Sequence, residues 1–248
     1  MSKQLSPLQI IERALHKRVI HDPDYKAFRE KTTRLTVLGL RLPVMAEIEE
    51  AGFSFYDESP DRILNVWDRI WRHATVHEVM SLPLFYYRRH KQDLNPASWK
   101  RMKGWIGRVE NWEHADMLCA LFSIFYERYP GLVEPTLRQW NRSKNPWKRR
   151  ASIVSTIYYA NKKRKAPSIK TVLSLIKPLL HDQDVYVQKG VGWQLREAYN
   201  LWPRKTLAFL EVHILELPAT TFSYATEKLT QVDKRRLKQK RARHRALA

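Results

Sequence analysis

The sequence has one cysteine, few glycines and no long run of apolar residues. Because Cys119 is alone, an intrachain disulfide and a zinc site built from several thiolates are excluded, which fits a reducing cytoplasm. Only seven glycines in 248 residues argue against a β-barrel or β-sandwich, which need many tight turns. No stretch approaches the roughly 18 apolar residues of a membrane span, and charges interrupt the apolar N-terminal stretch, which is unlike a signal peptide. We expect a cytoplasmic protein.

Acidic residues are scarce relative to basic ones. The chain has 25 Asp and Glu against 45 Lys and Arg, a formal net charge of +20 and a pI near 10.1. Residues 234–248 hold eight Lys or Arg and no acid, and the other 37 bases still leave +12 without them. Such an excess attracts polyanions. The alternative is a basic protein whose charge only keeps it soluble.

The capping signals and apolar spacing predict helices along most of the chain. A capping residue followed by proline, a frequent helix start, occurs at Ser6-Pro7, Ser59-Pro60, Asn95-Pro96 and Asn145-Pro146. No alternating run bounded by Asn-Gly or Asp-Gly predicts a hairpin. The apolar spacing predicts further helices at residues 43–51, 75–92, 112–129, 131–142, 168–181, 183–200, 203–216 and 219–229. The sequence therefore predicts an all-α fold.

Two of these helices begin alike. The segments 145–153 and 184–192 each have a turn residue, an aromatic or apolar pair and then a basic residue followed by a small one. The basic residues, Arg150 and Lys189, are separated by a period close to that of HEAT-type helix pairs. The small residues Ala151, Gly190 and Gly192 would permit close packing of helices. We expect a superhelical array of HEAT-like antiparallel helix pairs with a concave basic face, unless the similarity is a coincidence between two amphipathic helices.

Three groups of residues could carry chemistry. Trp112 and Asp116 are four apart at the start of an apolar helix, where the helix dipole favours a carboxylate. On spacing alone, a dipole-stabilising aspartate beside a packing tryptophan is the better interpretation. Trp193 follows Gly190 and Gly192, whose helical cost of about 1 kcal/mol each requires either close helix packing or close approach of a ligand.

The third group follows Trp147 at a helix start, where cations oppose the helix dipole. Lys148, Arg149 and Arg150 could bind a phosphate there, although a solvated face explains them equally well. His73, His77 and Glu78 lack the order of a zinc motif, so we expect no metal site. No glycine-rich nucleotide-binding motif and no G-x-S-x-G sequence occurs.

These residues occur in an order that resembles a known family. Asn111-Trp112-x-x-x-Asp116, Trp147-x-x-Arg150-Ala151 and the stretch from Gln188 to Glu197 are similar to motifs of the AlkD-type bacterial DNA alkylation repair glycosylases. Leu38 to Pro43 resembles the early Gly-Leu-Arg-x-Pro element of that family. The resemblance covers roughly residues 8–230 and leaves the basic tail outside.

The resemblance implies a superhelix of HEAT-like repeats that removes N3- and N7-alkylated purines from double-stranded DNA without a metal or other cofactor. It implies that Trp112 and Trp193 face the lesion nucleotide, that Asp116 is the catalytic carboxylate and that Arg150 contacts a phosphate. We expect Arg149, Lys148 and Lys189 to contact DNA as well. The protein would act as a monomer in base excision repair, with no membrane partner.

Two features depart from the family or lie outside it. The aromatic residue that the family places on its second helix has no clear counterpart, although Tyr25 and Phe28 are nearby. Residues 1–232 are expected to form one repeat domain, and residues 233–248 a disordered basic tail. The other hypotheses are a non-enzymatic binder of branched or damaged DNA and a HEAT-type scaffold for an acidic protein.

Overall fold

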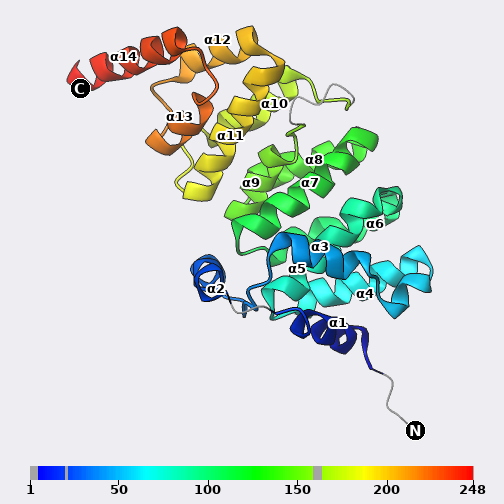
Figure 1. Ribbon diagram of the computed structural model, residues 1–248. Coiled ribbons are helices and arrows are strands. Elements are labelled where there is room, and N and C mark those ends of the chain that lie inside the picture. The colour runs from blue at the N-terminus through cyan, green and yellow to red at the C-terminus, as the bar shows by residue number, and fades with distance from the viewer. Residues whose placement is uncertain (1–4, 20–21, 159–163, 248) are drawn as a thin grey trace. The chain divides into compact units, whose positions relative to one another are not determined.

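The computed structural model describes residues 5–19, 22–158 and 164–247. These residues form two compact units, which span residues 1–121 and 122–248 and divide within one helix. Helices make up both units (Figure 1), and the described ranges contain no β-strand, only an isolated bridge between Thr36 and Val76. The predicted all-α class is confirmed. The single domain over residues 1–232 stays a prediction.

The described residues of the first unit form six complete helices and the start of a seventh. Their bounds are α1 (Pro7–His16), α2 (Pro23–Glu30), α3 (Leu42–Glu50), α4 (Pro60–His73), α5 (His77–Arg89), α6 (Pro96–Met102) and α7 (Trp112–Arg128), with short 3₁₀ turns at Ser54–Asp57, Lys91–Asp93 and Lys103–Arg108. The predicted proline starts of α1, α4 and α6 are confirmed. Helix α2 was not among the predicted helices, although Asp22-Pro23 carries the same start signal: the Asp22 carboxylate accepts the backbone N–H of Tyr25 at 3.1 Å.

Tryptophan dominates the core of the first unit. Trp71 and Trp105 stack with ring centroids 5.0 Å apart, and both are almost completely buried. Their indole N–H groups are satisfied, because Trp71 donates to the Trp105 carbonyl at 3.0 Å and Trp105 donates to Asp68 at 2.7 Å. These two indoles contribute a large apolar area without leaving an unpaired donor, so they fix α4 against the segment that leads into α7.

The second unit continues with α7, and the part of it that the structure describes forms seven further helices. Their bounds are α8 (Pro130–Asn141), α9 (Pro146–Val154), α10 (Ile169–Ile176), α11 (Val185–Leu201), α12 (Pro203–His213), α13 (Ala219–Ala225) and α14 (Gln231–Leu247), with a 3₁₀ turn at Lys177–Leu179. Helix α11 packs most extensively, against α9 and α13. The helix predicted from Asn145-Pro146 is confirmed, and Asn145 caps it by accepting the N–H of Trp147 at 2.8 Å.

The basic tail is helical, which differs from the disordered tail that we expected. Residues 231–247 form α14, and Leu237 is 1% exposed. The physical reason is a cap and an anchor that the charge run concealed. Thr230 accepts the backbone N–H of Asp233 at 3.1 Å and begins the helix, while Leu237 supplies apolar burial. Ala248 and the first four residues lie outside the described residues.

Glycine permits the close packing of α11 that the small residues predicted. A Cβ at Gly192 would lie 2.5 Å from the Tyr224 Cβ and 2.8 Å from the Thr221 carbonyl oxygen. At Gly190 it would lie 3.1 Å from an Arg150 guanidinium nitrogen. Both glycines therefore have a packing role, towards α13 and α9 respectively.

We predict that Gly192→Ala lowers the free energy of unfolding by roughly 1–3 kcal/mol, because α13 must move to admit the methyl group. The matched control is Gly131→Ala in α8, where a Cβ would meet nothing within 4 Å. That variant should be neutral or up to about 1 kcal/mol more stable. Urea denaturation of the three proteins measures the difference, and equal stabilities of the two variants would contradict the packing role.

Candidate functional site

The start of α7 holds two of the predicted site residues. Asn111 caps the helix, because its side-chain oxygen accepts the backbone N–H of His114 at 2.9 Å. Trp112 is the first residue of α7, and Asp116 follows one turn later on the same side of the helix. Both side chains are half-buried. Asp116 therefore lies just beyond the first turn of α7, in which the acidic residue is Glu113.

A buried ion pair anchors this end of α7 to α2. The Arg29 and Glu113 side chains are 8% and 7% exposed, and Arg29 Nη2 donates to Glu113 Oε1 at 3.0 Å while Nη1 also contacts the carboxylate. The guanidinium carbon lies 5.6 Å from the centroid of the Trp112 ring. Breaking such a buried pair from one side costs about 3–5 kcal/mol. The pair therefore fixes Trp112 and the first turn of α7.

The Gly-Leu-Arg-x-Pro element places α2 relative to α5. Gly39 has a φ of +91°, a conformation that glycine adopts without strain. This turn directs the backbone N–H groups of Leu38, Gly39 and Leu40 to the carboxylate of Glu78, at 3.0, 2.8 and 3.2 Å. Three converging N–H groups stabilise a buried carboxylate. Glu78, which we had considered only as part of a metal motif, thus holds the element against α5.

Arg41 of the same element completes the attachment of α2. Its Nε and Nη2 donate to Asp22, the N-cap of α2, at 3.0 and 2.7 Å. Its guanidinium carbon also lies 4.9 Å from the Tyr25 ring centroid. The hydrogen bond and charge of Asp22 raise the pKa of Arg41. The Gly-Leu-Arg-x-Pro element is therefore attached to α2 at the first turn of that helix.

Both aromatic residues of α2 contact Arg29. Its guanidinium carbon lies 5.2 Å from the Tyr25 ring and 5.8 Å from the Phe28 ring, and Arg29 Nε donates to the Tyr25 hydroxyl at 3.0 Å. Phe28 is 54% exposed, whereas Tyr25 is half-buried. Tyr25 is thus engaged in contacts within the protein. The Phe28 ring is exposed and lies beside the Arg29 guanidinium, which also contacts Trp112.

Two buried histidines lie beneath the Arg29–Glu113 pair. The rings of His77 and His114 stack with centroids 4.4 Å apart, and His77 Nε2 is 3.5 Å from a Glu113 oxygen. Ser81 Oγ lies 2.9 Å from His114 Nε2. Burial lowers the pKa of both histidines, strongly for His114, and raises that of Glu113, which Arg29 partly offsets. The histidines are therefore neutral at pH 7.

In the second unit, α9 and α11 begin with the same geometry. Asn145 accepts the N–H groups of the second and third residues after it, and Asp184 does the same for α11. The two aromatic residues that follow, Trp147 and Tyr186, pack against each other with ring centroids 5.0 Å apart. The predicted similarity of the two segments therefore holds in the structure, in their caps as well as their sequence.

Arg150 connects these two helices from a buried position. It is 4% exposed, and its Nη1 donates to the Tyr186 carbonyl at 2.5 Å. Its guanidinium carbon lies 5.8 Å from the centroid of Trp193, which is half-buried. Gly190 leaves the space that this side chain occupies. The predicted site residues Arg150 and Trp193 are thus in contact with one another.

The other predicted DNA-contact residues, Arg149, Lys148 and Lys189, differ in the contacts that they make within the protein. Arg149 donates to both oxygens of Asp182, at 2.6 and 3.0 Å, and to the carbonyls of Ser143 and Lys144. Its guanidinium thus holds the loop before α9, and a contact of Arg149 with DNA stays a prediction. Lys148 and Lys189 are half-buried, and Lys189 Nζ lies 5.5 Å from the Tyr186 ring centroid.

The described ranges contain no group of three His, Cys, Asp or Glu that could hold a metal ion. No helix within them is both long enough and apolar enough to cross a membrane.

Similar solved structures define the class of fold. A predicted DNA alkylation repair enzyme from Enterococcus faecalis superposes with a TM-score of 0.73 at 13% identity, covering 84% of this chain and 94% of that one. AlkD2 from Streptococcus mutans gives 0.56 at 19% identity, covering 83% and 98%, and smu.31 from Streptococcus mutans UA159 gives 0.57 at 17% identity, covering 89% and 100%. No curated protein matches the sequence. The chain has the fold of AlkD-like helical repeat proteins.

The family model described as DNA alkylation repair enzyme matches residues 13–229. The chain belongs to this family, which confirms the AlkD-type resemblance, and its role lies in DNA alkylation repair. Helix α14 begins beyond the matched residues.

Arg29 and Glu113 were not among the predicted site residues. A signal was available for each: Arg29 follows Phe28 on a short helix that begins at Asp22-Pro23, and Glu113 is adjacent to Trp112. No sequence rule pairs two residues 84 positions apart, so their ion pair required the structure.

We predict that acidification below pH 6.5 destabilises the protein through His77 and His114. Their pKa values in the folded state lie below the ordinary 6.5, so below that pH the unfolded chain binds protons that the folded state does not. Stability is then present above pH 6.5 and is lost as the pH falls, by up to about 1.4 kcal/mol per pH unit for each histidine. Urea denaturation at pH 7.5 and 5.5 measures this loss.

The variant His114→Gln removes one of the two titrating groups. It should be less stable at pH 7.5, since the contact with Ser81 is altered, and should lose less stability between the two pH values than the unchanged protein. An equal loss in both proteins would show that His114 does not contribute.

Proposed function

We propose that the protein is a DNA glycosylase that excises cationic N3- and N7-alkylated purines from double-stranded DNA in base excision repair. The observation that carries this proposal is the half-buried Asp116 one turn after Trp112, on a helix start fixed by the buried Arg29–Glu113 pair. A reacting carboxylate must be held in place before the substrate arrives, and this anchor supports such a role. The family membership supplies the DNA substrate.

Release of an N3- or N7-alkylated purine depends more on a nearby negative charge than on a general acid. A purine alkylated at N3 or N7 is already cationic and leaves readily, so the bond to be broken is the glycosidic C1′–N bond. As it stretches, the sugar becomes oxocarbenium-like, and a nearby carboxylate stabilises the positive charge and can orient water. We assign this role to Asp116. Its position one turn after Trp112 puts it on the same side of α7 as that tryptophan.

Tryptophan faces suit a cationic nucleotide. Each contact between a cation and an aromatic face is worth about 0.5–2 kcal/mol, and we propose that Trp112 and Trp193 contact the lesion nucleotide. Arg29 and Arg150 lie within 6 Å of these two rings respectively. Each arginine holds its indole from within the protein, so the half-buried ring keeps its orientation while part of it stays accessible. We further propose Phe28, the exposed ring on α2, as the aromatic residue that completes the group in the first unit.

Positive side chains would bind the DNA backbone. Lys148 and Lys189 remain the candidates from the repeated helix starts. Arg150 is proposed as a phosphate contact by the family resemblance, and its buried position supports a second role in joining α9 to α11.

We predict that Asp116→Asn lowers the rate of 7-methylguanine release from duplex DNA by at least about 100-fold, because the developing charge on the sugar loses its counter-charge. Release is measured under single turnover with enzyme in excess over DNA. Affinity for the same duplex should change little, since an amide replaces the carboxylate at nearly the same volume. The matched control is Asp61→Asn, an exposed aspartate in the first turn of α4, which should release base at the unchanged rate.

Other outcomes would identify the alternatives. No release by the unchanged protein, together with tight binding to branched DNA, would replace the glycosylase proposal with that of a non-enzymatic DNA binder. Weak DNA binding that does not depend on salt would favour a scaffold for an acidic protein, since neutralisation of phosphates makes affinity strongly salt-dependent. A parallel loss of release and thermal stability in Asp116→Asn would assign Asp116 a folding role.

A further inference from the structure

Helix α14 is a highly charged element outside the family match. It follows the last matched residue, 229, and residues 231–247 contain eight Lys or Arg and a single acid, Asp233. Like charges so close together repel one another, so a helix of this composition needs tertiary contacts to form. The contacts that it makes divide its cations into two groups.

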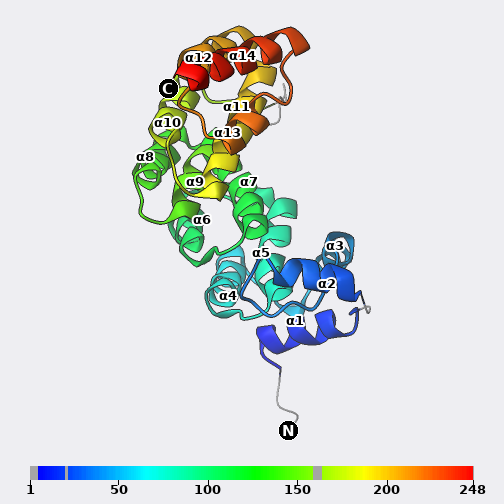
Figure 2. The ribbon, with the colours of Figure 1, turned by 90° about the vertical axis from the view of Figure 1, so that its left-hand side faces the viewer.

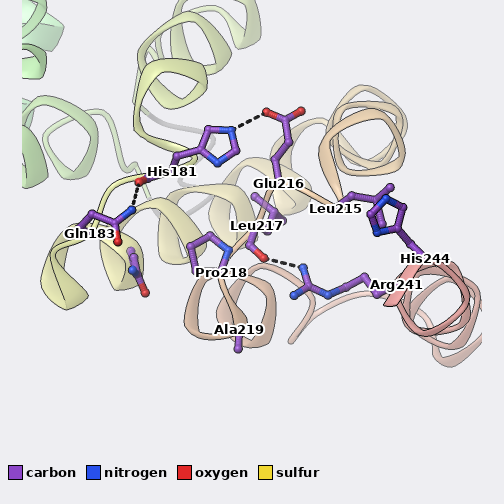
Figure 3. A pocket seen from close by; sticks show the side chains of 10 residues that line it. His181, Gln183, Leu215, Glu216, Leu217, Pro218, Ala219, Arg241 and His244 are labelled. Atoms are coloured by element: carbon purple, nitrogen blue, oxygen red, sulfur yellow. Dashed lines mark hydrogen bonds and ion pairs between the residues drawn. The ribbon is translucent and has the colours of Figure 1, made fainter. Parts of the chain in front are cut away.

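One group docks the helix onto α12 and the loop after it. Arg241 Nη1 donates to the carbonyls of Ile214 and Leu217, at 2.8 and 2.6 Å, and its guanidinium carbon lies 4.8 Å from the Phe222 ring centroid. Figure 3 shows this arginine reaching towards the Leu217 carbonyl at the edge of a pocket of about 360 Å³. The last carbonyls of a helix are otherwise unsatisfied, so Arg241 caps α12 from outside.

Two more cations and one leucine complete the docking. Arg236 pairs with Glu211, and Lys240 Nζ donates to the Glu211 carbonyl at 2.7 Å. Leu237, on the same side of α14, is 1% exposed. Helix α14 lies near the end of α12 in both views (Figures 1 and 2). The helix is thus held by its side chains at positions 236, 237, 240 and 241.

The second group of cations is not used for docking. Lys234, Arg235, Lys238 and Arg243 are exposed or half-exposed, and within the described ranges none of the four forms an ion pair with a carboxylate. We name these four residues the outer basic face of α14. From 234 to 243 the helix rises about 14 Å, a length over which duplex DNA carries about eight phosphates.

We propose that the outer basic face of α14 is an additional, sequence-independent contact surface for the phosphate backbone of duplex DNA. The docked helix presents these charges in a fixed position, so binding does not require the ordering of a flexible tail. This proposal rests on the proposed function only for the choice of duplex DNA as the partner.

The composition of the outer face favours a polyanion over a membrane. An interfacial helix needs an apolar face that enters the bilayer. The large apolar residue Leu237 is buried against the protein, and the one exposed large apolar residue of α14 within the described side chains is Val232, 69% exposed near the N-terminal end. Charge complementarity is therefore the only attraction that this surface offers.

The test compares two full-length variants with equal loss of charge. In the first, Lys234, Arg235, Lys238 and Arg243 are all replaced by Gln. In the control, four exposed bases of the first unit, Arg69, Arg88, Lys100 and Lys103, are replaced by Gln; no carboxylate among the described residues pairs with them. Affinity for an undamaged 20-base-pair duplex is measured over a series of salt concentrations.

The slope of log K against log salt should fall in magnitude by about 2 to 4 in the α14 variant, since each lost phosphate contact contributes about 0.9. The control should change it by less than about 1. Equal changes in the two variants would overturn the proposal, as would an unchanged duplex affinity combined with weaker binding of the α14 variant to phosphatidylserine vesicles or to duplex RNA. Unchanged thermal stability of the α14 variant verifies that docking is intact.

Base release separates this proposal from the proposed function. At saturating enzyme, the α14 variant should release 7-methylguanine at the unchanged rate, because α14 binds the DNA and takes no part in bond cleavage. If the unchanged protein releases no base, the glycosylase proposal fails while the comparison of duplex affinities still decides the role of α14.

Discussion

The buried ion pair between Arg29 and Glu113 is the interaction on which the candidate site depends. Both charges are nearly inaccessible to water, so each is tolerable only because the other is present. The same guanidinium contacts the rings of Trp112, Phe28 and Tyr25. One side chain thus determines where the aromatic residues of α2 lie relative to the start of α7, and Asp116 follows one turn later.

In the second unit, too, a buried arginine contacts a tryptophan, but its other contacts differ from those of Arg29. Arg150 is also buried, but it donates to a backbone carbonyl of α11 and contacts Trp193 instead of pairing with a carboxylate. Its space exists because residue 190 is glycine. In each unit a half-buried tryptophan is therefore held by a buried guanidinium. This arrangement orients the indole ring and leaves part of it exposed. A tryptophan that is to contact DNA needs both properties.

Much of the fold could be predicted from the sequence, because caps and prolines act locally. Ser6-Pro7, Asn95-Pro96 and Asn145-Pro146 each begin a helix with the expected side-chain cap. The similarity of segments 145–153 and 184–192 corresponded to a repeated helix start.

What could not be predicted depends on long-range contacts. The charge of residues 234–248 indicated disorder, whereas residues 231–247 form α14, which Leu237 and Arg241 hold against α12 and the loop that follows it. Likewise, no sequence pattern indicated the ion pair between Arg149 and Asp182. The concave basic face stays a prediction.

A double-mutant cycle on Arg29→Met and Glu113→Leu measures whether the buried pair anchors α7, with the free energy of unfolding determined for all four proteins. Each single variant leaves one buried charge without its partner and should lose about 3–5 kcal/mol. The double variant removes both charges and should lose clearly less than the sum of the two, with a coupling energy above about 2 kcal/mol. Additive losses, with a coupling below about 0.5 kcal/mol, would show that the pair does not anchor α7 and would contradict the account.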